Sequence, residues 1–414
     1  MAENSTLQRD PDVVTYETFK GLRSDVTPER FGPEDLAVGV NIDIDKTGRI
    51  ARRDGYTRVL GGGAHSLWAD ELQEFCLFVA GTDLMRLSPA WVAQRLAGLA
   101  SSNRMSFVRV SDRIYFSNAI DTGVIERDAR VRSWGLPVPG LPVPTLTVGQ
   151  MSAGRYQFTL TQLRDDGQES GAPRAGVIEV PEGAGLDFAL PTAAPEAVAR
   201  VLYLSTPNGE VLYAAVQLDA QLSRYRYTGD TLALNLPLAT QFLQAAPAGQ
   251  LVTYYRGRLY VAAGDVLYPS AAFGYELFDL REYVPLDGRI TMLAPMTDKE
   301  IAADRARGSG LFVGTDRSCG VLVGADPSDF QYVPKADYGA IPGALAYVDG
   351  ALFGDDSLGA RALPMWLTTQ GLCVGMPDMA IRNLTRSHYT FAASGWGAAL
   401  FMPGPNRFIA TANL

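Results

Sequence analysis

One stretch near the middle of the chain, Gln250–Met292, constrains the fold more than any other part of the sequence. It contains three short runs of β-branched and aromatic residues separated by two-residue turns. The runs are Val252–Tyr255, Leu259–Ala263 and Val266–Tyr268, and the turns are Arg256-Gly257 and Gly264-Asp265. This pattern predicts a three-stranded antiparallel meander. A lone meander leaves an apolar face and a sheet edge in water, so it becomes stable when several copies pack around a shared centre, as the blades of a propeller do.

The same alternation of short apolar runs and turn residues continues on both sides of residues 145–225. Between the two parts, the proline-rich segment Leu136–Pro144 indicates a semi-rigid linker. The hairpin signals Asp166-Gly167 and Asn208-Gly209 follow it. About seven short strands in this region are typical of a β-sandwich, and the absence of a Cys-Trp-Cys pattern favours the fibronectin kind over the antibody kind.

We therefore predict an all-β fold, with a β-propeller-like core of about four to seven blades that is interrupted by an inserted fibronectin/immunoglobulin-like β-sandwich. The predicted parts are an N-terminal arm with a first hairpin (1–60), the first part of the propeller (61–143), the inserted sandwich (144–225) and the second part of the propeller (226–414). One helical turn is expected at Pro33–Leu36, because proline favours the first turn of a helix.

The composition excludes several classes of protein. No window approaches eighteen uninterrupted apolar residues, so we expect no membrane span, and the polar N-terminus predicts no signal peptide. The three cysteines, Cys76, Cys319 and Cys373, are odd in number and far apart, which indicates free thiols. A net charge of −9 argues against a general DNA-binding surface but not against a surface that DNA slides past.

Carboxylate pairs are the strongest catalytic candidates, because glycosidases use two acids. The pairs are Asp70-Glu71, Asp165-Asp166 and Asp355-Asp356. All three have turn-like surroundings, so we interpret them as solvated turn residues. The loop Gly324–Phe330 holds only two carboxylates, Asp326 and Asp329, too few for an EF-hand-like calcium site.

The other candidates favour structural roles. His65 and His388 are the only two histidines, and the sequence contains no nucleophile elbow, so Ser-His-Asp catalysis is not expected. Gly61-Gly62-Gly63 does not join a strand to a helix and is interpreted as a loop. Tyr254-Tyr255 and Trp366 could bind a sugar, but core packing is the favoured use. We accordingly predict no catalytic, cofactor-binding or metal-binding residues, and no enzyme activity.

Charged residues occur on the returning strand of the first predicted hairpin, Arg49–Leu60. Arg49, Arg52, Arg53 and Asp54 fit either a solvated strand face or a contact with a neighbouring subunit.

Several segments carry a resemblance to a known family. The entry segment contains Asp25, Pro28, Phe31, Leu36, Asn41, Asp43, Gly48, Arg52, Gly55 and Tyr56. Further along stand YFSNAIDTGVI, GRYQFTLTQLRDDGQESG, GRLYVAAGDVLYPS, WLTTQGLCVG with AIRNLT, and WGAALF with RFIAT. Together, in this order and over most of residues 21–412, they resemble the tail-tube or nozzle proteins of short-tailed bacteriophages.

The resemblance implies a virion structural protein of the phage tail, located below the portal and the head–tail adaptor. Family members are propellers with an added β-domain that assemble as a ring, expected here to be a homohexamer, and viral DNA passes through the lumen during ejection. Expected ring contacts are the N-terminal arm, the charged segment Thr297–Gly310 and the inserted domain. The chain is short for a nozzle, so a simpler tail-tube or connector ring is a second form of the same prediction.

Two alternatives stay open at this point. The first is a glycan-binding or glycan-cleaving propeller in a receptor-binding tail component, and the second is a bacterial interaction propeller without a phage role.

Overall fold

The computed structural model describes residues 18–45, 47–59, 61, 63–70, 74–296, 310–353, 362–386, 388–389 and 395–412. The prediction of an all-β fold is confirmed, because the described residues form many small sheets, nearly all of them antiparallel. Helical structure in these ranges is limited to three short 3-10 turns, η1 (Pro28–Arg30), η2 (Pro327–Asp329) and η3 (Gly350–Phe353). No helix of the described chain has the length and apolar character needed to cross a membrane.

The described residues fall into two compact units. Those within Gly61–Thr297 and Ser309–Pro334 form a larger unit, and those within Met1–Leu60 and Lys335–Leu414 form a smaller one.

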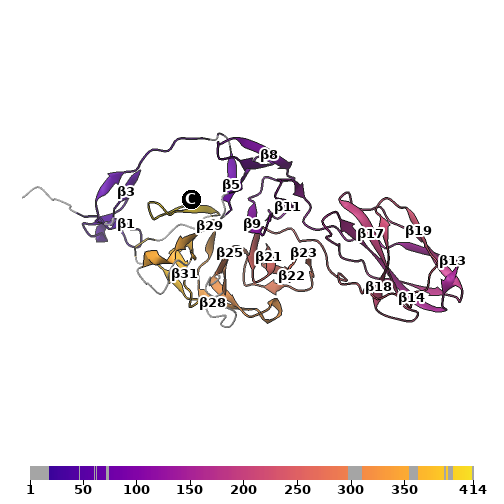
Figure 1. Cartoon of the computed structure of the whole chain (residues 1–414). Coiled ribbons are helices and arrows are strands. Elements are labelled where there is room, and N and C mark those ends of the chain that lie inside the picture. The colour runs from indigo at the N-terminus through magenta and orange to yellow at the C-terminus, as the bar shows by residue number, and fades with distance from the viewer. Residues whose placement is uncertain are drawn as a thin grey trace, which may run out of the picture. The chain divides into compact units, whose positions relative to one another are not determined.

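Four meander sheets make up much of the larger unit (Figure 1). The first has β5 (Ala64–Ala69), β6 (Cys76–Ala80), β7 (Asp83–Leu87) and β8 (Ala93–Gly98). The second has β9 (Ser106–Val110), β10 (Arg113–Ser117), β11 (Thr122–Ile125) and β12 (Val131–Arg132). The third has β20 (Leu251–Tyr255), β21 (Arg258–Ala263), β22 (Val266–Ala271) and β23 (Gly274–Phe278), with β24 (Val284–Pro285) paired to β22. The fourth has β25 (Ile290–Met296), β26 (Gly310–Thr315), β27 (Cys319–Val323) and β28 (Gln331–Ala336).

The third sheet contains the meander predicted at Gln250–Met292, which is confirmed: β20, β21 and β22 pair antiparallel in sequence order. Its two tight turns use positive φ angles, 47° at Arg256 and 75° at Gly257 in the first, and 68° at Gly264 in the second. These are the conformations that match the twist of a two-residue hairpin.

The meander sheets bury their apolar faces against one another, because a meander is not stable alone with its apolar face in water. Phe107, Ile114 and Phe116 of the second sheet share a cluster with Leu77 and Val79 of the first. A second cluster joins Tyr115 and Val124 to Val252, Leu259 and Val261 of the third sheet, and a third cluster continues into the fourth sheet. The closure of such sheets around a common axis stays a prediction.

The inserted region is a two-sheet sandwich whose strands are gathered in one body (Figure 1). One sheet has the order β13-β16-β19 and the other β15-β14-β17-β18. The strands are β13 (Val143–Met151), β14 (Gly154–Arg164), β15 (Gly176–Val180), β16 (Ala184–Ala189), β17 (Ala197–Ser205), β18 (Leu212–Asp219) and β19 (Arg224–Tyr227). Residues of both sheets form the core, including Tyr156, Leu160, Leu186, Phe188 and Leu202, each at most about 1% exposed.

The segment Leu136–Pro144, interpreted from its prolines as a linker, lies between β12 and the sandwich and is anchored at its two ends. Pro144 already belongs to β13, and Leu136 is 1% exposed and packs with Ala197 and Ala220. The Leu136 N–H also donates to Gln168 Oε1 at 3.2 Å. Both ends of the segment are thus fixed, while residues 137–142 run from β12 to β13 without regular secondary structure.

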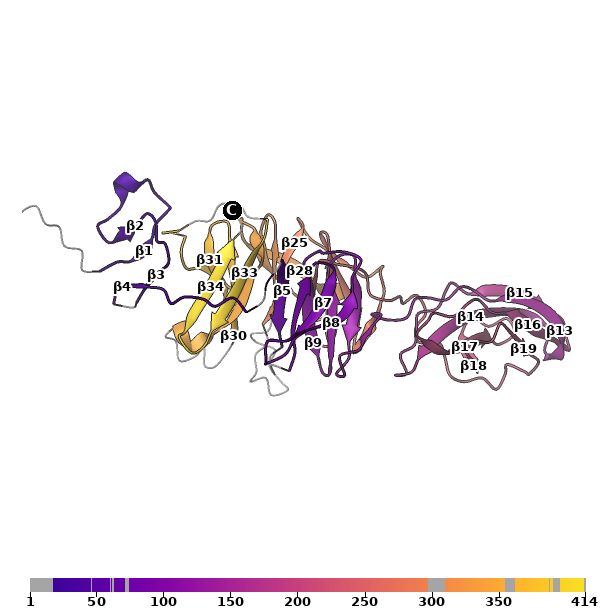
Figure 2. The same cartoon turned by 90° about the horizontal axis from the view of Figure 1, so that it is seen from above.

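The smaller unit contains a fifth meander and a hairpin, drawn in orange and yellow in Figure 2. The meander has β29 (Ala340–Asp349), β30 (Ala362–Thr368), β31 (Gly371–Gly375) and β32 (Ile381–Asn383), and the hairpin has β33 (Gly397–Met402) and β34 (Arg407–Ala412). Strand β33 lies beside β29, and Ile341, Ala344 and Leu367 form a small core there.

Short strands precede these sheets in the chain. They are β1 (Gly21–Leu22), β2 (Asp35–Leu36), β3 (Ile42–Ile44) and β4 (Ile50–Arg52). The helical turn predicted at Pro33–Leu36 is wrong, since Asp35 and Leu36 pair in parallel with Gly21 and Leu22. The proline that starts a helical turn is Pro28 of η1.

Candidate functional site

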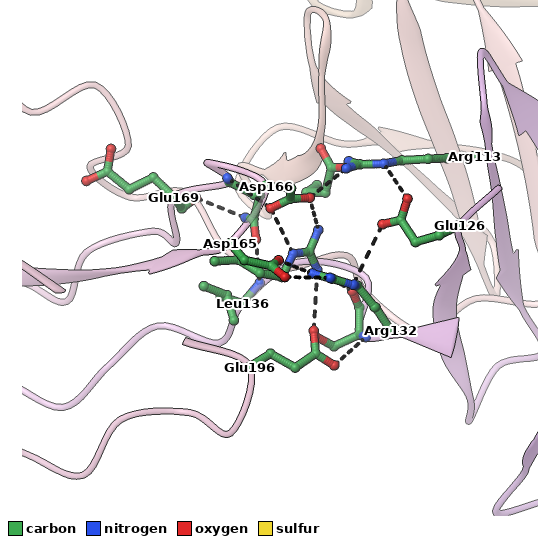
Figure 3. Close-up of polar contacts among 12 residues, drawn as sticks. Arg113, Glu126, Arg132, Leu136, Asp165, Asp166, Glu169 and Glu196 are labelled. Atoms are coloured by element: carbon green, nitrogen blue, oxygen red, sulfur yellow. Dashed lines mark hydrogen bonds and ion pairs between the residues drawn. The ribbon is translucent and has the colours of Figure 1, made fainter. Parts of the chain in front are cut away.

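A cluster of arginines and carboxylates connects the sandwich to the second and third meander sheets, and we call it the junction (Figure 3). Its charged members are Arg113, Glu126, Arg132, Arg164, Asp165, Asp166, Glu196 and Glu276. Arg113 and Arg132 come from the second sheet, Glu276 from the third, and Arg164, Asp165 and Asp166 from the end of β14 and its turn.

Arg113 contacts carboxylates from all three parts of the junction, namely the second sheet, the third sheet and the sandwich. Its Nη2 lies 2.6 Å from Asp166 Oδ2, its Nη1 2.8 Å from Glu276 Oε1, and its Nε 3.2 Å from Glu126 Oε2. Glu276 also accepts a hydrogen bond of 2.9 Å from the buried Tyr115 hydroxyl. One guanidinium thus joins the second sheet, the third sheet and the sandwich through charge-assisted hydrogen bonds, the stronger kind.

Each of the other two arginines binds one aspartate of the Asp-Asp turn. Arg132 makes a two-pronged contact with the Asp165 carboxylate, in which Nη2 lies 2.8 Å from Oδ2. The side chain of Arg164 has no exposed surface; it donates to Asp166 through Nε at 3.1 Å and through Nη2 at 3.0 Å. Its Nη1 reaches the Ser133 carbonyl at 3.0 Å. A fork of this geometry requires arginine rather than lysine.

The local sequence explains why both carboxylates reach the junction. Strand β14 ends at Arg164, and the tight turn that follows closes with the Gly167 N–H donating to the Arg164 carbonyl at 3.0 Å. Gly167 has φ of 83°, which glycine adopts without strain. Asp166 accepts the Gln168 N–H at 3.2 Å, an Asx-type contact that fixes its side chain.

Hydrogen bonds from neutral donors support the ion pairs. Glu196 accepts both the N–H and the hydroxyl of Ser133, at 3.0 and 2.9 Å. The indole N–H of Trp134, a residue that is 2% exposed, donates to the Tyr275 carbonyl at 2.8 Å. The segment that leaves β12 is therefore held on both sides before it enters the sandwich.

The electrostatics keep the two aspartates ionised. Partial burial alone would raise the pKa of Asp166, but hydrogen bonds from Arg164 and the Gln168 N–H, with the arginine charges, outweigh it and hold that pKa far below its usual range. The hydrogen bond from Arg132 likewise lowers the pKa of Asp165. A general acid needs a raised pKa, so this pair is suited to binding cationic side chains rather than to proton transfer.

The two remaining carboxylate pairs do not join the junction. Asp70 is buried, accepts the Phe75 N–H at 2.6 Å and forms an ion pair with Arg109. Glu71 and the whole pair Asp355-Asp356 lie outside the described residues. In the loop Gly324–Phe330, Asp326 caps η2 and lies 3.1 Å from Arg258 Nη2. No group of three or more potential metal ligands occurs among the residues that the structure describes.

The histidines and aromatics lie apart from the junction. The half-buried His65 has Nδ1 2.9 Å from Ser66 Oγ, and burial with the nearby Arg104 charge lowers its pKa. The His388 carbonyl accepts the Ser24 N–H at 2.8 Å. Trp366 is fully buried and Tyr255 is 2% exposed, so both pack in the interior, whereas Tyr254 is half-buried against Tyr275.

The smaller candidates can be placed as well. Cys76, Cys319 and Cys373 form no disulfide. Within the glycine run, Gly61 and Gly63 stand in a loop before β5, and Gly62 lies outside the described residues. Residues 1–17 of the arm and residues 297–309 of the charged segment also lie outside them. Arg53 pairs with Asp43 at 2.9 Å, while Arg49, Arg52 and Asp54 are exposed.

The Asp165-Asp166 turn was predicted from the sequence, but its partners were not. Arg113, Arg132 and Glu276 are remote from it in the chain, and nothing in their local sequence marks them. The signal that could have found them is a single charged residue in an otherwise uncharged strand, as with Arg113 in RIYFS and Glu276 in GYELF. A charge at such a position needs a partner when it is buried.

Neither a comparison with models of known protein families nor a search of curated protein sequences found a match for this chain.

Proposed function

We propose that the chain is a structural subunit of the tail of a short-tailed bacteriophage, and that identical copies form a closed ring below the portal and adaptor through which DNA passes during ejection. The starting point is the ordered series of segments that resembles tail-tube and nozzle proteins. In this proposal the protein is a virion component without a catalytic centre, and a homohexamer is the expected ring.

The junction is the observation that carries the proposal. A subunit that transmits load within a tail needs its added domain fixed to its core, because a flexible tether would let the domain swing. Here three arginines and five carboxylates occupy the place where the chain leaves β12 and enters the sandwich. The Asp-Asp pair that a glycosidase would use for chemistry is instead saturated by Arg113, Arg132 and Arg164.

The mechanism of such a ring is mechanical and electrostatic. The chain carries a net charge of −9, so acidic side chains are available to line a lumen. An acidic wall repels the phosphate backbone, and DNA then passes without adhering. Ring contacts of this kind are head-to-tail, so each copy presents two different surfaces to its neighbours.

Mass photometry of the purified full-length protein tests the proposal. The expected result is a discrete species of about six times the 44.6 kDa chain mass, with no intermediate ladder at concentrations above the assembly threshold. A protein that stays monomeric at every accessible concentration would contradict the ring.

The glycan alternative predicts a different outcome of a parallel experiment. A receptor-binding component would bind or shorten a host polysaccharide as a monomer or trimer. Sedimentation with fluorescent capsular or lipopolysaccharide glycan, followed by sizing of the glycan, separates the two functions. Saturable binding or cleavage by a species smaller than the ring would replace the structural proposal by the glycan one.

A further inference from the structure

The strand β13 forms an open edge of the sandwich. In the sheet order β13-β16-β19, the strand β13 pairs only with β16 among the described residues. Every second residue of an edge strand directs its N–H and C=O away from the sheet, where they can pair with another chain. The strand is nine residues long and contains no charged residue from Val143 to Met151.

Two apolar residues on the core face of β13 are incompletely covered. Leu146 pairs directly with Leu186 and Val148 with Ala184, and both partners belong to the sandwich core. Directly paired residues lie on the same face of a sheet, so Leu146 and Val148 are on the core face. Yet Leu146 is 52% exposed and Val148 is 85% exposed. One additional strand beside β13 would cover them.

The other three edges of the sandwich are protected. The β18 edge is covered by the following loop, because the Ala214 N–H donates to the Leu236 carbonyl and the Leu238 N–H to the Leu212 carbonyl, each at 2.8 Å. The β19 edge carries Arg224 and Arg226, both paired with Asp187. The short β15 edge carries Glu179. Charges and covering loops are the usual devices against edge pairing.

On β13, features that hinder pairing with another strand occur only near its two ends. Pro144 lies near its start, and a β-bulge interrupts the pairing between Val148 and Met151. They leave Thr145–Val148 as a window for one short strand. The strand order explains why no described strand lies on the outer side of β13. The pairs β13-β16 and β14-β17-β18 correspond to strands B-E and C-F-G of an immunoglobulin domain, in which strand A pairs with the free side of B.

The chain segment before β13 cannot fill this place. It contains Pro137, Pro139 and Pro142, which lack the N–H that a ladder needs, and Leu136 at its start is buried elsewhere. The strand therefore has to come from another part of the chain or from another molecule.

The N-terminal arm has the required composition and length. Residues 1–17 lie outside the described structure and contain Val13-Val14-Thr15-Tyr16, a run of β-branched and aromatic residues between Asp12 and Glu17. In an extended chain Val14 and Tyr16 fall on one side, where they would cover Leu146 and Val148. Seventeen extended residues reach about 55 Å from Thr18.

We propose that the N-terminal arm of a second copy adds as a strand to the edge of β13 and links neighbouring subunits. The choice of a second copy rests on the proposed ring, because arm and edge are two different surfaces and so make a head-to-tail contact that can close. Backbone hydrogen bonds supply the affinity, and the alternate side chains Val14 and Tyr16 supply the specificity.

Amide hydrogen exchange on assembled protein tests this assignment. The full-length chain is compared with a variant that lacks residues 1–17, which removes no described residue. We expect exchange at Thr145–Val148 to be at least about tenfold slower in the full-length assembly, because new ladder hydrogen bonds protect edge amides. A synthetic peptide of residues 1–20, added to the truncated protein, should restore the protection.

Two matched substitutions sharpen the test. Val148→Lys places a charge at an 85% exposed position of the β13 edge and should abolish both the protection and the effect of the peptide. Val177→Lys changes a 48% exposed valine on the β15 edge and should leave both unchanged. Equal exchange rates in the full-length and truncated chains would overturn the proposal, as would protection that persists when the full-length chain is diluted to monomers.

The outcomes also separate this proposal from the ring itself. Closed rings formed by the full-length chain, with Thr145–Val148 exchanging as fast as in the truncated chain, would reject the arm contact and leave the proposed function standing. Arm-dependent protection in dimers or open filaments would support strand addition and reject the closed ring.

Discussion

The junction can be tested by removing a single charge, with the substitution Asp166→Asn. Asp166 is the carboxylate shared by Arg113 and Arg164, and its side chain is 18% exposed. Asparagine has the same shape and keeps one acceptor oxygen, so the change removes charge with little loss of packing. The fully buried Arg164 then keeps the Ser133 carbonyl at 3.0 Å and a longer contact of 3.5 Å with Glu196.

The expected cost follows from the burial of the partners. Hydrogen bonds to charged groups contribute about 1.5–3 kcal/mol, and an incompletely neutralised buried charge adds a penalty, so we expect Asp166→Asn to lower the free energy of unfolding by about 2–3 kcal/mol. For a unit of this size that corresponds to a fall in Tm of about 5–10 °C. Limited proteolysis should at the same time cut more readily between β12 and β13.

The control is an ion pair of the same chemistry on the surface. Asp83 pairs with Arg95 at 2.7 Å, but the two side chains are 43% and 60% exposed. Exposed pairs contribute less than about 1 kcal/mol, so Asp83→Asn should change Tm by at most about 2–4 °C. Differential scanning calorimetry of the two variants decides the matter. Equal effects of Asp166→Asn and Asp83→Asn on Tm would refute the claim that the junction holds the sandwich to the meander sheets.

Three further predictions concern pH, packing and a buried cation. The pKa of Asp166 is lowered in the folded protein. The contribution of Asp166 to stability is therefore complete above the unfolded pKa of about 3.9 and is lost as the pH falls toward the folded pKa. In calorimetric scans, the Tm difference between wild type and Asp166→Asn should stay constant from about pH 7 to 5 and shrink below about pH 4. A Cβ at Gly171 would lie 1.6 Å from the Leu243 carbonyl oxygen, so Gly171→Ala should cost about 1–3 kcal/mol in denaturant titration, whereas Gly63→Ala, with open space around it, should cost less than about 0.5. Arg200 is 1% exposed and donates to the Pro191 and Leu222 carbonyls. Arg200→Ala should therefore speed up amide hydrogen exchange around residues 190 and 222. Unchanged exchange there would show that Arg200 does not hold these two segments together.

The fold class could be predicted from the sequence because its signals are local. The runs Val252–Tyr255 and Leu259–Ala263 alternate with predicted turns, and in the structure Arg256, Gly257 and Gly264 of these turns have positive φ angles. Turn chemistry acts over a few residues, so a pattern of this kind survives without an alignment. The short pairing of Gly21–Leu22 with Asp35–Leu36 was missed because it depends on a loop of twelve residues rather than on local propensity.

The junction could be predicted only in part, since ion pairs between distant residues leave no local pattern. The Asp165-Asp166 turn was recognised, but as a solvated turn, whereas the structure surrounds it with three arginines. Arg113 and Glu276 are 163 residues apart in the chain, and only the packing of two sheets brings them within 2.8 Å. Tertiary contacts of that range lie beyond any window of sequence.

The central claim, a ring-forming subunit, is tested most directly by electron microscopy of the purified full-length protein. We expect closed rings with rotational symmetry and a central opening wide enough for a DNA duplex, about 20 Å across. Class averages that show only single subunits, two-fold dimers or open filaments, at concentrations where the protein is fully folded, would contradict it.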